Sequence, residues 1–275
     1  VSLFITVTNR TFTADAASDE CTASASLSAS NYTASAVTFT TTGTLPAGLS
    51  LATNYFLIFS SATVFKVATT VANANAATAI NITDAGTGTH TVNFISPGTI
   101  NHIIRDPRTS VRFFHDSSGR VWYLASGGST CYLLNGNTLT NGNGNGLGIL
   151  VNSDTTATYL FVFRNALIDV VNVFGTAQLE TPTWTSSWQT MNTGATTNNR
   201  HKALKGQDGI IYYGDANFVG SFREVAGQVF NPATGSTYTF TQDALDMPNS
   251  EVIEDVEELG EDLLAEGSTF NRIYP

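Results

Sequence analysis

Alternation of apolar and hydroxyl-bearing residues over short runs is the feature that most restricts how this chain can fold. Residues 1–96 form a series of such runs, each rich in Val, Ile, Thr, Phe and Tyr and each broken by turn residues. In Val37-Thr38-Phe39-Thr40 the alternation gives a strand one apolar face and one polar face, and helical periodicity is absent from this part. We therefore expect an all-β protein whose residues 1–96 form a β-sandwich-like or barrel-like module.

The surface is expected to be polar through hydroxyl and amide groups rather than through charges. Only 12% of the 275 residues are charged, about half the share of an average soluble domain, whereas 42% are hydrophobic and can build cores. The net charge is −10 and the twelve Lys and Arg residues are scattered, so we expect no nucleic-acid partner. The chain has no apolar run of about 18 residues and no basic leader, so we expect no membrane insertion and no secretory signal.

Two glycine-containing turns punctuate the first module. In Leu45-Pro46-Ala47-Gly48-Leu49-Ser50, a proline that fixes φ stands near a glycine with a permissive backbone, between leucines that can anchor the turn to a core. The second turn, Asp84-Ala85-Gly86-Thr87-Gly88-Thr89, leads into the run His90-Thr91-Val92. We expect both turns to be structural, and we expect His90 to be a packed or capping residue because no Asp, Glu or Cys stands at ligand spacing.

Residues 42–94 resemble a small β module that recurs in bacteriophage tail proteins and other virion proteins. The resemblance rests on the order of four segments: LPAGLS, the tyrosine-bearing run NYFLI, VFKVA, and AINITDAGTGTHTV. The chain differs at Ala52-Thr53-Asn54-Tyr55, where a Gly-Thr-x-Tyr turn is usual, and in the Ala/Asn-rich segment 71–77. The resemblance implies a virion structural protein associated with the tail, as a part of the tail tip, the nozzle or the fibre attachment.

A second domain, residues 97–275, is predicted from Ser96-Pro97-Gly98 onward, where the composition shifts towards Arg, Asp and aromatic residues. The aromatic or apolar pairs Trp122-Tyr123, Tyr212-Tyr213 and Leu263-Leu264 each follow a glycine turn. Repeat anchors at 119, 157, 209 and 260 are spaced by 38, 52 and 51 residues, close to the ~40–50 residues of a propeller blade. We therefore expect a β-propeller-like domain, incomplete within this chain, with an irregular sandwich as the alternative.

The segment Asn249–Leu259 can be read as a helix or as a strand. Its capping residue, early acidic residues and apolar stripe favour a helix, but its position before Gly260 in the repeat favours a strand. We give preference to the repeat, so Val252–Leu259 should pair with Leu263–Ala265, and Thr269–Tyr274 should form a third strand. The open edge of that third strand would be covered by more chain, by the first blade or by another subunit.

The sequence offers few candidates for chemistry. Asp116 and Gly119 approach the Asp box of sialidase-type propellers, but two residues separate them, and the box is a structural turn in any case. The glycine-rich stretch 141–148 lacks the lysine and the strand–helix setting of a phosphate loop. Cys21 and Cys131 are expected to be buried free thiols, with a disulfide as the alternative, and no metal-ligand spacing surrounds either. We therefore expect no catalytic, cofactor-binding or metal-binding residues and no enzyme activity.

Exposed tryptophans are the remaining candidates for a binding site. Trp184 and Trp188 lie in the loop-like stretch TPTWTSSW and could stack on sugar rings, whereas Trp122 is expected to be core. The leading expectation is a non-enzymatic structural component of a bacteriophage virion, assembled in the host cytoplasm with other virion proteins and copies of itself. The alternative is a carbohydrate-binding adhesin for a host surface glycan, and a less favoured one is a polysaccharide depolymerase, which would need a pair of carboxylates.

Overall fold

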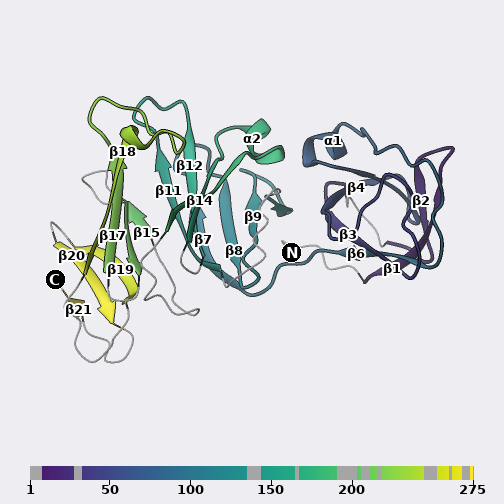
Figure 1. The fold of residues 1–275 in the computed structure, drawn as a ribbon, viewed down its shortest axis with the longest axis horizontal. Coiled ribbons are helices and arrows are strands. Elements are labelled where there is room, and N and C mark those ends of the chain that lie inside the picture. Colours follow the sequence, from purple (N-terminus) through teal and green to yellow (C-terminus); the bar gives the residue numbers. More distant parts are fainter. Residues whose placement is uncertain are drawn as a thin grey trace. The chain divides into compact units, whose positions relative to one another are not determined.

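The computed structural model describes residues 8–27, 33–134, 144–164, 167–190, 203–205, 211–215, 218–244, 253–259, 262–267 and 273–274. By its internal contacts the chain divides into two compact units. The first unit comprises Val1–Ser96 with Gly127–Asn135, and the second comprises Pro97–Ser126 with Gly136–Pro275. Strands dominate both units (Figure 1), so the expected all-β class is confirmed.

The first unit is a closed barrel of six strands in the order β1-β2-β5-β4-β3-β6. The strands are β1 (Arg10–Asp15), β2 (Glu20–Ala23), β3 (Ala36–Thr41), β4 (Tyr55–Phe59), β5 (Val64–Ala68) and β6 (His90–Phe94). Antiparallel pairing of β1 with β6 closes the ring, which removes the free edges that a sandwich would leave. A short helix, α1 (Val71–Asn75), precedes β6, and the Thr70 hydroxyl caps it by accepting the Asn73 amide.

The barrel core follows from the alternation seen in the sequence. On β3, Val37 and Phe39 are buried, whereas Thr38 is half-buried and Thr40 is exposed. Phe12 packs edge-on against Phe39 and Phe65, with ring centroids 5.3 and 5.9 Å apart. Each buried phenylalanine contributes about 1.5–3 kcal/mol relative to an exposed one, so this cluster accounts for much of the barrel's stability.

In its described residues the second unit has four antiparallel sheets that follow one another along the chain (Figure 1). The first has the order β10-β9-β8-β7, with strands β7 (Ile100–Arg105), β8 (Arg112–Asp116), β9 (Val121–Leu124) and β10 (Tyr132–Leu133). Its strand β10 belongs to the segment Gly127–Asn135 that groups with the first unit. The second has the order β11-β12-β13-β14, with strands β11 (Gly144–Val151), β12 (Thr158–Arg164), β13 (Leu167–Asn172) and β14 (Trp184–Thr190). A short helix, α2 (Thr176–Glu180), lies between β13 and β14.

The last two sheets repeat this consecutive order. The third sheet comprises β15 (Ala203–Lys205), β16 (Ile211–Asp215), β17 (Phe218–Glu224) and β18 (Tyr238–Ala244), with a 3₁₀ turn, η1 (Gly235–Thr237), before β18. The fourth comprises β19 (Ile253–Leu259), β20 (Asp262–Gly267) and β21 (Ile273–Tyr274). The preference for a strand over a helix before Gly260 is thus confirmed. The β19–β20 register pairs Leu259 with Asp262, so the connection is one residue shorter than predicted.

The predicted repeat is out of step in the first sheet. Gly119 lies in the turn between β8 and β9, the second and third strands, whereas Ala157 lies between β11 and β12, the first and second strands of their sheet. The true counterpart of the turn at Ala157 is the β7–β8 turn. There the Asp106 amide binds the Val111 carbonyl at 2.8 Å, as the Asn152 amide binds the Ala157 carbonyl at 3.1 Å. The sequence pattern places the anchor at Gly119 because the notable glycine and aromatic residues lie there, whereas the β7–β8 turn, residues 107–110, contains no glycine.

Candidate functional site

The two segments that carry the resemblance lie against each other on the barrel. The Asp84 carboxylate accepts the amide of Ala47 at 2.9 Å and the amide of Gly86 at 2.8 Å. The Thr87 amide donates to the Thr44 carbonyl at 2.8 Å, and the Thr44 amide donates back to the Thr87 hydroxyl at 3.1 Å. We call residues 43–49 and 82–89, joined in this way, the latch. The two amides lower the pKa of Asp84 from its ordinary value.

Glycines are required in the latch because side chains would collide with its backbone. A Cβ on Gly43 would meet the Thr87 carbonyl, one on Gly86 the Thr44 carbonyl, and one on Gly48 the Asn81 carbonyl, all closer than van der Waals contact. Gly48 and Gly86 also have positive φ, 103° and 66°, which favours glycine. The latch is therefore a packed structural element with no space for a ligand between its two segments.

His90 packs against the latch, and both of its ring nitrogens have partners in the barrel. Its ring is 4% exposed, with Nε2 3.0 Å from the Ala85 carbonyl and Nδ1 2.9 Å from the Thr41 hydroxyl. A carbonyl can only accept, so Nε2 carries the proton. The ring packs on Phe12 at a centroid distance of 5.5 Å. His90 thus has the packing role that the sequence predicts.

Asp116 organises the β8–β9 turn from a fully buried position. Its Oδ1 accepts the amides of Ser118 and Arg120 at 2.8 and 2.9 Å, and its Oδ2 accepts the Gly98 amide at 3.1 Å and the Trp122 indole N–H at 2.9 Å. The residue inserted relative to an Asp box is accommodated because both turn amides still reach Oδ1. Trp122 is 4% exposed, so it has the core role expected.

The structure separates the two tryptophans proposed for glycan stacking. Trp188 is 8% exposed and lies among Phe161, Phe222 and Phe230, at centroid distances of 5.4, 5.5 and 5.7 Å. Neighbouring rings occupy the space that a sugar would need, so the core alternative describes Trp188. Trp184 begins β14 and is half-buried, which leaves part of its surface accessible.

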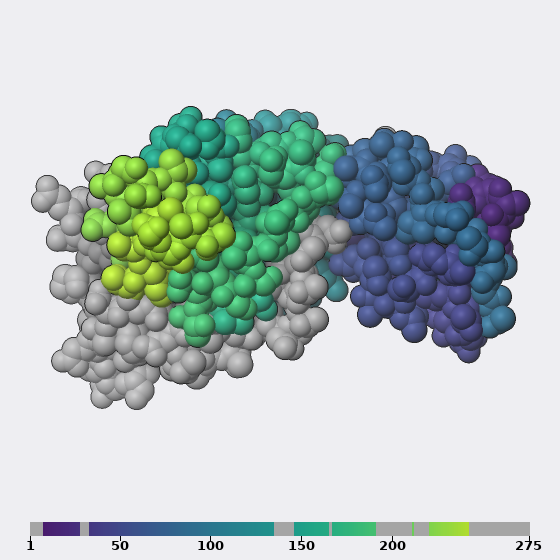
Figure 2. Space-filling model, turned by 45° about the horizontal axis from the view of Figure 1, so that its top comes forward, coloured from purple at the N-terminus to yellow at the C-terminus, as the bar shows by residue number. Residues whose placement is uncertain are grey.

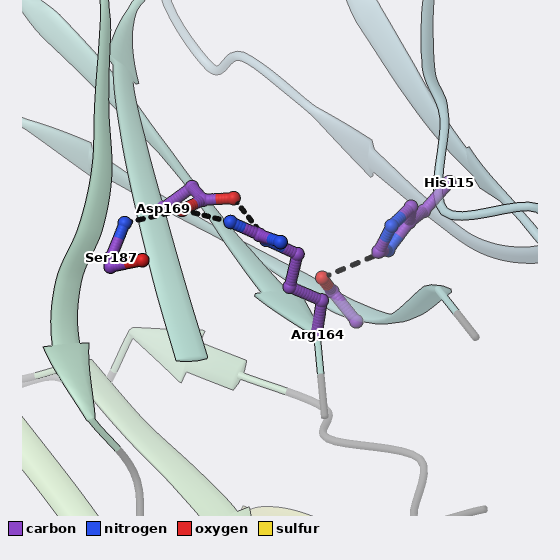
Figure 3. A network of polar contacts seen from close by, with 5 residues as sticks. His115, Arg164, Asp169 and Ser187 are labelled. Atoms are coloured by element: carbon purple, nitrogen blue, oxygen red, sulfur yellow. Dashed lines mark hydrogen bonds and ion pairs between the residues drawn. The ribbon is translucent and has the colours of Figure 1, made fainter. Parts of the chain in front are cut away.

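Polar groups that the sequence analysis did not single out join the first two sheets of the second unit. His115 is fully buried on β8, and its Nδ1 lies 3.2 Å from the Gly146 carbonyl on β11 (Figure 3). The amide of Leu147, the next residue, donates to Nδ1 of His102 on β7 at 2.7 Å. Burial lowers the pKa of His115 to about 4, and the nearby Asp116 carboxylate opposes that effect. His102 and His115 are 13 positions apart and form no recognisable sequence motif. They become neighbours only through the register in which β7 pairs with β8.

A buried ion pair fixes a bulge in the second sheet (Figure 3). Asp169 on β13 is fully buried and binds the guanidinium of Arg164 at Nε and, at 2.9 Å, at Nη2. The same carboxylate accepts the Ser187 amide at 2.6 Å. Ser187 has φ 53°, and the β13–β14 register shifts at this point. Because both carboxylate oxygens are already bound, Asp169 has a structural role.

An open cavity of about 590 Å³ is lined by residues of the second and third sheets. In Figure 2 the yellow-green residues of the third sheet lie beside the green residues of the second. Glu224 forms part of its wall and accepts the amides of Ser153 at 3.1 Å and of Phe230 at 3.0 Å. Polar and apolar groups both line the cavity. Among them are Leu150, Val151, Ser153, Arg223, Gln228 and Thr239.

Other classes of site find little support in the described part of the chain. No group of three or more His, Cys, Asp or Glu side chains that could hold a metal ion occurs among the described residues. Cys21 and Cys131 are buried free thiols, and burial raises their pKa values to about 12 and about 11. Within the same described ranges, no helix has the length and apolarity needed to cross a membrane.

Neither a known protein family nor a curated protein matches this chain.

Proposed function

We propose that this chain is a non-enzymatic structural component of a bacteriophage virion, associated with the tail. The observation that carries the proposal is the latch. Its two segments are separated by 37 positions at Asp84 and Ala47, yet they form one packed unit on a closed barrel. The residues that carry the resemblance to virion modules are therefore those that hold this barrel together, which is what a shared module would require.

The character of the barrel surface supports permanent assembly. Its strands expose hydroxyl groups, such as those of Thr13 and Thr40, more often than charges, although Asp15 is an exposed charge. Burying a charge at an interface carries a desolvation penalty of several kcal/mol, whereas hydroxyl and amide groups can be paired or hydrated at lower cost. A charge-poor surface of this kind suits contacts with copies of the chain and with other virion proteins.

The second unit is proposed to be propeller-like, with its four sheets as blades. Each sheet is built from consecutive antiparallel strands, and the first strands of neighbouring sheets touch: β7 contacts β11, β11 contacts β15, and β15 contacts β19. In a propeller the blades are arranged radially around a central channel, which brings corresponding strands of neighbouring blades together. An irregular sandwich would give no reason for the first strand of each sheet to contact the first strand of the next.

The proposal is tested on purified particles and on the isolated protein. Mass spectrometry of density-purified phage particles that encode the chain should find its peptides, and separated tails should be enriched in them relative to heads. Light scattering after size-exclusion chromatography should show an oligomer at about micromolar concentration. A chain that stays monomeric and is missing from the particles contradicts the proposal.

A second candidate, a carbohydrate-binding adhesin, is favoured by the cavity of the second unit. A sugar site needs polar groups that fix orientation beside apolar surface, and Arg223, Gln228 and Thr239 with Leu150 and Val151 supply both. Binding of host-envelope polysaccharide should be weakened by Arg223→Ala if the cavity is the site. It should be weakened by Trp184→Ala if the half-buried tryptophan is the site. Chain cleavage of the polysaccharide would instead support the depolymerase alternative.

A further inference from the structure

His102 and His115 bind the two ends of a single peptide group. They are cross-strand partners on β7 and β8. The peptide that links Gly146 to Leu147 on β11 offers its carbonyl to His115 Nδ1 at 3.2 Å and its N–H to His102 Nδ1 at 2.7 Å. The pair therefore attaches the first strand of the second sheet to the first sheet.

The partners of the two rings fix their protonation. A carbonyl oxygen can only accept, so Nδ1 of His115 carries a proton; an amide N–H can only donate, so Nδ1 of His102 carries none. A proton on His102 Nδ1 would place two N–H groups against each other and break that hydrogen bond. A second proton on His115 would go to Nε2, which is buried and makes no hydrogen bond with the described residues.

The surroundings offer little compensation for a charge on His115. Burial lowers the pKa of this ring to about 4 and outweighs the Asp116 carboxylate and the backbone groups of Gly146 and Gly119, which favour the charged ring; the neighbouring His102 disfavours it. Asp116 already accepts the Trp122 indole and three backbone amides, so it is engaged in the turn. The other charged side chains on the elements around this contact, namely β7, β8, β11 and the strands that pack on β11, are Arg105, Arg112, Arg164, Lys205 and Asp215.

We propose that His102 and His115 form an acid-sensitive joint that holds the first sheet of the second unit to the second sheet at neutral pH and releases it on acidification. Both rings act in the same direction. A proton on His102 Nδ1 breaks the hydrogen bond with the Leu147 amide, and a second proton on His115 is disfavoured for as long as that ring stays buried. Each proton taken up on opening makes the open state about tenfold more populated per pH unit of acidification. The joint depends on this geometry alone and does not require the proposed virion role.

The first test needs no variant. Nitrogen-15 chemical shifts of the histidine rings at about pH 7.5 should show His115 with its proton on Nδ1 and His102 with its proton on Nε2. Finding the same tautomer on both rings, or a charged ring at this pH, overturns the proposal.

The second test measures opening by amide hydrogen exchange in peptides that cover 146–151, with peptides of β3 in the barrel as an internal reference. Between about pH 7 and pH 5, after correction for intrinsic exchange, protection of 146–151 should fall at least about tenfold relative to the reference. The double variant His102→Asn with His115→Asn keeps an acceptor and a donor near the Nδ1 positions but cannot be charged. It should retain protection at both pH values.

The matched control is His90→Gln, which keeps a donor towards the Ala85 carbonyl in the barrel and should leave the pH response of 146–151 intact. An equal loss of protection in the wild type and the double variant, or none in the wild type, overturns the joint. If the double variant does not fold, the tautomer measurement and the pH dependence of exchange in the wild type still decide whether the joint exists.

Discussion

Asp84 accepts the amide N–H of Ala47 at 2.9 Å across 37 positions of sequence, and this bond joins the two halves of the latch. The carboxylate also binds the amide of Gly86 at 2.8 Å, and both amides lower its pKa. A carboxyl group whose pKa is lower in the folded state stabilises the fold above its unfolded value of 3.8, and that contribution is lost as the pH falls through the lowered value. The contribution of Asp84 to the latch is therefore complete at neutral pH and is lost only in strong acid.

Substituting Gly86 by alanine should destabilise the barrel by more than positive φ alone explains. At φ 66° an alanine is strained by about 1–2 kcal/mol, and its Cβ would also collide with the Thr44 carbonyl. Gly127→Ala is the control, because Gly127 has φ 72° and open space around its Cβ position. Thermal unfolding followed by circular dichroism should show a clearly larger loss for Gly86→Ala. Equal losses would mean that the latch tolerates a side chain.

Replacing Asp116 should unfold the β8–β9 turn. Asp116→Ala would leave the Trp122 indole and three backbone amides without their acceptor, which should cost about 3 kcal/mol or more in the free energy of unfolding. Asp116→Asn should cost less, because one acceptor oxygen remains. Urea unfolding measured by tryptophan fluorescence reports the change. The control Asp154→Ala removes an exposed turn aspartate that binds Thr156 and interacts with Asn152, and it should have a far smaller effect.

The sequence predicted those elements whose signal is local. Alternation over 36–41 predicted β3 and its buried face, and the repeat position of 253–259 predicted a strand against its helical composition. Pairings between distant segments could not be predicted, because they depend on sheet register. His102 and His115 become neighbours only through β7–β8 pairing, and Trp188 enters an aromatic core only because β17 and its following loop bring Phe222 and Phe230 to it. Patterning specifies the faces of a strand but does not identify its partner.

The two tryptophans of β14 should differ strongly in how much stability is lost on truncation. Trp188→Ala removes a ring from the core with Phe161, Phe222 and Phe230 and should cost about 3–5 kcal/mol. Trp188→Phe should cost considerably less, since it refills most of the space and removes an indole N–H that has no partner among the described residues. Trp184→Ala should change stability by less than about 1 kcal/mol because the side chain is half-buried. Chemical denaturation gives the free energy of unfolding of each of the three variants. A larger loss of stability in Trp184→Ala than in Trp188→Ala would contradict the assignment of Trp188 to the core.

Acid should destabilise the second unit through His115. The pKa of this ring is about 4 in the folded chain and 6.5 when unfolded, so the unfolded state binds more protons between these values. Stability is therefore fully present above about pH 6.5 and decreases by about 1.4 kcal/mol per pH unit down to about pH 4, a total of about 3 kcal/mol. The three tryptophans all lie in the second unit, so their fluorescence follows its urea unfolding separately from the barrel.

His115→Asn should flatten this dependence, because asparagine can donate to the Gly146 carbonyl without titrating in this range. Its stability should be lower than that of the wild type at pH 7, where a smaller side chain fills the site less well, and the two should converge towards pH 4. His90→Gln changes a histidine of the barrel and should leave the tryptophan-detected pH dependence unchanged. If His115→Asn and the wild type lose stability in parallel from pH 7 to pH 4, other groups cause the acid sensitivity and His115 is not the buried neutral ring inferred from its contacts.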